Sequence, residues 1–257
     1  MMIVDIESLV PESHLLKSID THIDFSFIYE LAAPYYSAIG RKSIDPVSLI
    51  KMLLVGFLYG IKSERRLVEE VSLNLAYRWF CGFDLTDKIP NHSLFSQNRR
   101  RRFTDSMIFR DIFNHIVRLC VEKGIVTGDA VVSDGTFIPA NVSNSSLVKI
   151  VEEVEKSAIY YLDALDEELR QQEGYKEPIP VTEEKTMLKS TTGPDCGYID
   201  QEHKKGLGYL SQMTVDTQSG IILGVDCYPA NQRESSIVLR HLDKIKADTG
   251  ININKIA

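Results

Sequence analysis

Cysteine is scarce and dispersed in this chain of 257 residues. The four cysteines, Cys81, Cys120, Cys196 and Cys227, form no CxxC pair, which excludes a disulfide scaffold and a structural zinc site of the usual spacing. Long apolar runs are missing too: the longest, Met52–Tyr59, falls far short of the roughly 20 residues of a membrane span. The amino terminus has acids in place of the basic region of a secretory signal. We therefore expect a cytoplasmic protein with no membrane partner.

Several catalytic signatures are missing as well. The histidines show no HxxxH or HExxH spacing, Ser133 and Ser211 have no GxSxG setting, and Lys204-Lys205 lies outside any GxxxxGKS pattern. These absences exclude a histidine-ligated metal site, a serine hydrolase and a P-loop nucleotide site.

What the chain does have is an uneven charge distribution. The formal net charge is −7. Residues 41–118 nevertheless contain 14 Lys and Arg against eight Asp and Glu, a net charge of +6, so the other residues carry −13. A basic segment inside an acidic chain predicts a polyanionic partner for that segment.

The first half of the sequence predicts helices. We assign 1–40 to an amino-terminal arm and 41–124 to a helical DNA-binding domain. Asp45-Pro46 supplies a helix cap followed by proline at the first helical position, and Ser63 and Asn91 can cap two further helices. Short helices joined by tight turns are typical of a helix-turn-helix module, in which one helix lies in the major groove of DNA.

Beyond Val126 the pattern becomes strand-like, so the fold class we expect is α+β. Residues 147–190 are predicted to form an insertion that contains an amphipathic helix. Two strands joined by a turn at Thr217–Gly220, a helix ending at Gly250, and a strand beginning at Ile251 follow. This order is that of an incomplete RNase H-like mixed α/β domain over 125–257, whose last strand is parallel to its first.

Asp134 is the candidate metal ligand. It interrupts a hydrophobic strand and precedes Gly135, which allows a close approach by another group. Mg²⁺ is held by one or two carboxylates plus waters and phosphate oxygens. The alternative is a turn aspartate that accepts hydrogen bonds from nearby backbone N–H groups.

Arginines are the candidate DNA contacts. Arg99, Arg100, Arg101 and Arg102 place four positive charges within about one helical turn, so some of them must face solvent or phosphate. Arg65 and Arg66 add to the same basic segment. The alternative for such a run is a solvated helix end that pairs with acidic side chains.

Several ordered motifs resemble the insertion-sequence transposases of the DDE type. They are DPVSLIKMLLVGFLYGIKSERRLVEEVSLNLAYRWFCGFDL, PNHSLFSQNRRRRF, DGTFIPANVS, TTGPDCGY, GLGYLSQMTVD and the DCYPAN of Asp226 to Asn231. The resemblance implies a protein of a bacterial mobile element, associated with the nucleoid when bound to DNA. It further implies helices that bind terminal inverted repeats of double-stranded DNA, an RNase H-like domain that cuts and joins strands with Mg²⁺ in DNA transposition and recombination, and a homodimer.

Asp134 matches the first of the three acids in that family. The second acid lies at the end of the strand that Ile253–Ala257 begins, and the third lies on a later helix, so this sequence stops before both. We therefore expect little phosphoryl transfer from this polypeptide alone. Two other readings stay open: a non-catalytic, truncated transposase that acts as a DNA-binding regulator or inhibitor, and an unrelated Mg²⁺-dependent nuclease that completes its site with Asp226 or Asp216.

Overall fold

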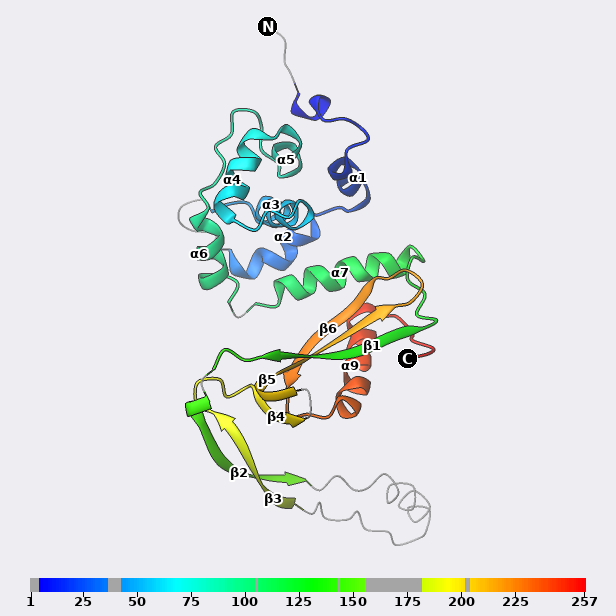
Figure 1. The fold of residues 1–257 in the computed structure, drawn as a ribbon. Helices are drawn as coiled ribbons and strands as arrows, with labels where there is room; N and C mark the ends of the chain where they lie inside the picture. The colour runs from blue at the N-terminus through cyan, green and yellow to red at the C-terminus, as the bar shows by residue number, and fades with distance from the viewer. Residues whose placement is uncertain (1–4, 37–42, 105, 143, 156–181, 202–203) are drawn as a thin grey trace. The chain divides into compact units, whose positions relative to one another are not determined.

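The structure is a computed structural model that describes residues 5–36, 43–104, 106–142, 144–155, 182–201 and 204–257. The chain divides into two compact units, Met1–Ile116 and Val117–Ala257. The first unit contains only helices in its described part, and the second contains the sheets (Figure 1). The mixed α+β class expected from the sequence is therefore confirmed at this level.

The helices of the first unit are short and follow one another closely. They are η1 (Ile6–Leu9), α1 (Leu15–His22), α2 (Phe27–Ala32), η2 (Ala33–Tyr35), α3 (Pro46–Leu58), α4 (Glu64–Leu73), α5 (Leu75–Phe80), α6 (Ser93–Arg101) and the first part of α7 (Ile108–Glu122).

Polar side chains cap α3 and α4 where the sequence predicts, whereas the N-cap residue of α6 is His92 and not the expected Asn91. Asp45 accepts a hydrogen bond from the Ser48 N–H at 2.9 Å, and the Pro46 ring occupies the first position of α3. Ser63 caps α4 through the Arg66 N–H. Such caps satisfy N–H groups that have no partner within the helix, which fixes where each helix begins.

The core of the first unit includes the segment expected to form an arm. Leu16, Phe25 and Ile28 are buried together with Leu49 and Met52 of α3. α1 and α2 are therefore part of the same core as α3. Their burial stabilises the unit because it removes large apolar surfaces from water. Apolar residues at positions 16, 25 and 28 are visible in the sequence, but their pairing with Leu49 and Met52, 21 to 36 positions away, is not.

The second unit is built on a four-stranded antiparallel sheet. Its strands are β1 (Val131–Pro139), β4 (Gly197–Gln201), β5 (Lys204–Asp216) and β6 (Ile222–Pro229). β5 is central: it pairs with β1 along one edge and with β6 and β4 along the other. The expected hairpin between β5 and β6 is confirmed.

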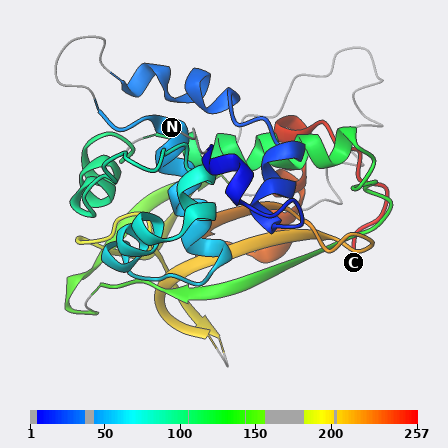
Figure 2. The same ribbon diagram turned by 90° about the horizontal axis from the view of Figure 1, so that it is seen from above.

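A helix and a parallel segment complete this sheet. α9 (Glu234–Thr249) packs on β5 and β6 and ends at Gly250, whose φ of 75° is readily adopted only by glycine. The chain then runs beside β1: the Val131 N–H donates to Lys255 O at 2.9 Å, and the Ala257 N–H donates to Val131 O at 2.9 Å. The bridge between Val131 and Ile256 is parallel, as the sequence predicts. Figure 2 shows this segment beside the start of β1 from a second direction.

The helical insertion is a wrong prediction for the residues that the structure describes. β2 (Leu147–Glu155) and β3 (Thr182–Ser190) form a separate two-stranded antiparallel sheet. The sequence LVKIVEEVE of β2 is rich in β-branched residues, whose stiff side chains favour strands. The remainder of the expected helix, at 156–181, lies outside the described residues.

Candidate functional site

Arg99, Arg100 and Arg101 lie in α6 and Arg102 is its C-cap residue, and the four have different surroundings. Arg99 forms an ion pair with Glu64 of α4, with 2.6 Å between Nη2 and Oε1. Arg102 donates to Ser43 and Asn98 and lies over the ring of Tyr36, 4.1 Å from its centroid. Arg100 and Arg101 are exposed, and their side chains have no hydrogen bond or ion pair to the described residues. All N–H donors of these two guanidinium groups are therefore available to a ligand.

Arg65 and Arg66 of α4 are exposed but paired within their own helix. Arg65 lies 4.0 Å from Glu69 and Arg66 lies 3.3 Å from Glu70, while the arginine side chains remain 79% and 70% exposed. Surface pairs of this kind contribute about 0.3–0.5 kcal/mol. They would exchange readily for a phosphate, although each arginine has an acid beside it.

Asp134 is exposed on β1, although it interrupts a hydrophobic strand. Its Oδ1 accepts a hydrogen bond from the Gly135 N–H at 2.9 Å. Its neighbour across the sheet is Met213, and the next along the same row is Val225, both more than 40% exposed. The carboxylate therefore lies on an open face of the sheet, and the local contact is the one expected of a turn aspartate.

Asp226 and Asp216 lie on the other face of this sheet. Asp226 is opposite Gln212, which is opposite Gly135, so the alternation of side chains along each strand points Asp226 and Asp134 in opposite directions. Asp216 accepts from the Ser219 N–H at 2.8 Å and from its hydroxyl at 2.7 Å. The register therefore gives no joint metal site to Asp134 with either acid, which removes the main support for the nuclease reading.

The pKa of Asp216 reflects its place in the β5–β6 turn. Burial acts to raise this pKa, but the hydrogen bonds from Ser219, with those from the N–H groups of Gly128 and Gln218, outweigh it, so the pKa lies below its ordinary value. This carboxylate has a structural function: it holds the hairpin turn.

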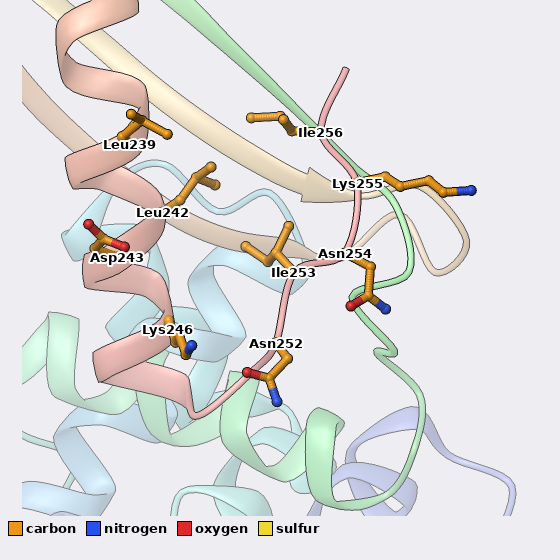
Figure 3. A pocket seen from close by; sticks show the side chains of 9 residues that line it. All are labelled: Leu239, Leu242, Asp243, Lys246, Asn252, Ile253, Asn254, Lys255 and Ile256. Atoms are coloured by element: carbon orange, nitrogen blue, oxygen red, sulfur yellow. The ribbon is translucent and has the colours of Figure 1, made fainter. Parts of the chain in front are cut away.

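A surface pocket of about 280 Å³ lies between α9 and the carboxy-terminal segment (Figure 3). Leu239 and Leu242 of α9 face Ile253 and Ile256 across it. Leu239 is 61% exposed and Ile256 is 47% exposed. This side of the segment is therefore apolar and only partly covered by the described residues.

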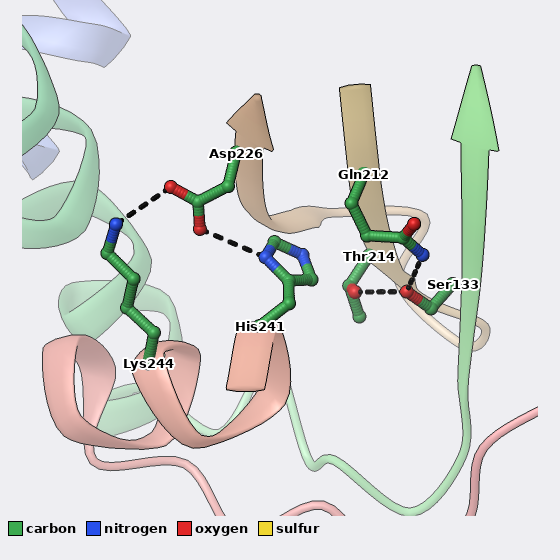
Figure 4. A network of polar contacts seen from close by, with 6 residues as sticks. All are labelled: Ser133, Gln212, Thr214, Asp226, His241 and Lys244. Atoms are coloured by element: carbon green, nitrogen blue, oxygen red, sulfur yellow. Dashed lines mark hydrogen bonds and ion pairs between the residues drawn. The ribbon is translucent and has the colours of Figure 1, made fainter. Parts of the chain in front are cut away.

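A polar network lies between the sheet and α9 (Figure 4). His241 Nδ1 is 3.0 Å from Asp226 Oδ2, and Lys244 Nζ is 2.8 Å from Asp226 Oδ1. Gln212 Nε2 donates to Ser133 Oγ at 2.8 Å, and Thr214 Oγ1 lies 2.9 Å from the same hydroxyl. His241, Gln212 and Thr214 are fully buried.

This network was not predicted from the sequence. His241 and Lys244 are one helical turn apart, and Gln212 and Thr214 alternate along a strand, so each pair faces one direction. The signal in the sequence was a set of polar residues at positions where side chains that face a covering helix are normally apolar. Its interpretation required knowing which faces meet.

Among the residues that the structure describes, no group of three or more His, Cys, Asp and Glu side chains is placed to hold a metal ion. Asp134 is a single possible ligand, which does not meet the needs of a two-metal site. In the same part of the chain, every helix is too short or too polar to cross a bilayer.

Comparison with protein families connects the helical unit to a known group. Residues 4–101 match a transposase domain, the family model described as Transposase domain (DUF772). This match supports a transposase family for the chain and covers α1 to α6, including the arginines of α6. No curated protein and no solved structure matches the chain.

Proposed function

We propose that this protein is a DNA-binding transposase whose helical unit contacts duplex DNA through the basic end of α6. The observation that carries the proposal is the exposure of Arg100 and Arg101, unpaired among the described residues, within the segment that matches a transposase domain. Guanidinium groups with free N–H donors bind phosphate oxygens and supply affinity that depends on salt. The partner would be the terminal inverted repeats of a mobile element, bound by a homodimer.

The sheet unit supports an RNase H-like reading of the second half. Three antiparallel strands in the order β1-β5-β6 are followed by α9 and by a segment parallel to β1. This is the strand and helix order that the resemblance implies. Short helices α3 to α6 are likewise compatible with a helix-turn-helix module, in which α6 would be the helix nearest to DNA.

Mg²⁺ chemistry at Asp134 is part of this proposal. The resemblance places a second acid at the end of the strand that Ile253–Ala257 begins, and this segment runs beside β1 toward Asp134: the Ser133 N–H donates to Ala257 O at 3.2 Å. The described residues supply only one carboxylate of such a site, so we derive no reaction step from them.

A second candidate function is DNA binding without catalysis, as in a regulator or inhibitor of a transposase. The lack of an acid cluster in the described part of the chain favours it. The two functions share the α6 surface and differ in what happens at Asp134.

Removal of the two free arginines tests DNA binding. In an electrophoretic mobility assay with the full chain and a mixed-sequence duplex of about 20 base pairs, the double variant Arg100→Gln with Arg101→Gln should bind more weakly. If each arginine neutralises one phosphate, the slope of log K against log salt should become about 1.8 less negative. Lys123→Gln, an exposed cation of the second unit, should leave the slope unchanged. An absence of binding by the unmodified chain at low salt would refute the proposal.

A cleavage assay separates the two functions. The 257-residue chain should not nick supercoiled DNA with Mg²⁺ or Mn²⁺, because a single carboxylate does not fix the two metals of a phosphoryl-transfer site. Cleavage that disappears in Asp134→Asn, with unchanged DNA binding, would favour a catalytic chain. Cleavage that also disappears in Asp226→Asn would restore the nuclease reading.

A further inference from the structure

A polar pocket of about 440 Å³ opens beside α6. Its lining includes two guanidinium groups, two side-chain amides and two hydroxyl-bearing residues, and none of the described lining residues is an acid. The residues are Tyr35, Ser43, Leu94, Gln97, Asn98, Arg101 and Arg102. Convergent donors without a carboxylate suit an anionic ligand.

Arg102 is held in place at one side of this pocket. Its Nη1 donates to Ser43 Oγ at 2.8 Å and to Asn98 Oδ1 at 2.7 Å, and its guanidinium plane lies over Tyr36. Asn98 is itself 6% exposed and donates to Leu94 O at 2.8 Å. Both bonds of Arg102 use Nη1, which leaves the N–H groups of Nη2 for a ligand. A fixed guanidinium loses less conformational entropy on binding than a free one.

Arg101 and Gln97 form the exposed side of the pocket. They are four residues apart on α6 and therefore lie on one face of the helix. The Arg101 side chain has no hydrogen bond or ion pair within the described part of the chain. Arg99, by contrast, lines a different, more apolar pocket together with its partner Glu64. The four arginines thus differ: Arg99 pairs with α4, Arg102 is fixed in the polar pocket, Arg101 is free at its rim, and Arg100 lies outside it.

We propose that this pocket seats one backbone phosphate of duplex DNA, with Arg102 as the fixed donor and Arg101 as the mobile donor. The inference rests on the proposed DNA binding and assigns it a contact point. A concave pocket receives the protruding phosphate of a strand, and a contact of this kind sets the register of a protein on DNA without reading a base. Arg100 lies outside the pocket and contributes as an independent charge.

The test measures binding of the full chain to the same mixed-sequence duplex from about 50 to 200 mM salt. Arg101→Gln should make the slope of log K against log salt about 0.9 less negative. Between 1 M and 0.1 M salt, the affinity of the variant should therefore rise roughly eightfold less than that of the unmodified chain. Arg102→Lys keeps the charge and loses the planar fork. It should weaken binding in the unmodified chain and have no further effect in the Arg101→Gln background, because both variants lose the same phosphate.

Arg100→Gln is the matched control, with the same change in charge one residue away. Its effect should add to that of Arg102→Lys, since the two act at different phosphates. Additive effects of Arg101→Gln and Arg102→Lys, or an Arg101→Gln slope equal to that of the unmodified chain, would overturn the pocket while leaving DNA binding intact. Absence of binding by the unmodified chain would overturn both. Thermal unfolding of each variant checks that it is folded. Because Arg101 is exposed, Arg101→Gln should stay folded, so its salt slope tests the pocket even if Arg102→Lys unfolds.

Discussion

Replacement of Asp226 with alanine is expected to destabilise the sheet unit by about 3 kcal/mol. The carboxylate is 10% exposed and accepts from two groups of α9, the fully buried His241 and the half-exposed Lys244. Its removal leaves the His241 Nδ1 buried with no acceptor, and an unmet buried donor costs more than the hydrogen bond itself contributes. For a unit of this size, the midpoint of thermal unfolding should fall by roughly 6–12 °C.

Two variants identify the cause of that loss. Asp226→Asn keeps a carbonyl oxygen for His241 and should lose roughly half as much stability as Asp226→Ala. Lys244→Met removes only the exposed partner and should cost less than about 1 kcal/mol. If Asp226→Ala and Lys244→Met have equal effects in calorimetry, the buried histidine contact does not hold α9 on the sheet.

Elements fixed by local chemistry could be predicted from the sequence. Asp45 with Pro46 determines the start of α3, Gly250 determines the end of α9, and the turn at 217–220 pairs β5 with β6. In each case the residues that decide the structure lie within a few positions of one another. The parallel direction of the last segment followed from the order of strands and helix, because connections of this type are strongly constrained.

Elements decided by distant partners could not be predicted. The 147–155 stretch combines an apolar spacing compatible with a helix with β-branched residues that favour a strand, and its pairing with 182–190 makes it a strand. From the sequence alone Arg99 is a free cation, because its partner Glu64 lies 35 positions away along the chain. The exposure of Asp134 depends on which face of the sheet α9 covers, and the covered face is the one that carries Gln212 and Thr214. The candidate site was therefore predicted as a set of residues and not as an arrangement.

Gly128 tests whether the carboxy-terminal segment is held against β1. Its φ of 74° lies in the left-handed region, and a Cβ placed there would lie 2.2 Å from the backbone oxygen of Asn252. The Gly128 carbonyl also accepts from the Asn254 N–H at 2.9 Å. Alanine should therefore add a backbone clash to the conformational strain and push the segment away from the sheet.

Gly124 supplies the matched control, because its φ of 68° imposes the same strain while nothing lies within 4 Å of a Cβ there. Gly124→Ala should cost about 1 kcal/mol, and Gly128→Ala about 3 kcal/mol in total, since a backbone oxygen cannot rotate away as a side chain does. Hydrogen exchange locates the difference: the Ala257 and Asn254 amides, which donate to Val131 and Gly128, should lose protection in Gly128→Ala and keep it in Gly124→Ala. Equal costs and equal exchange in the two variants would mean that the segment is not packed on Gly128, and the path of this strand toward Asp134 would then lose its support.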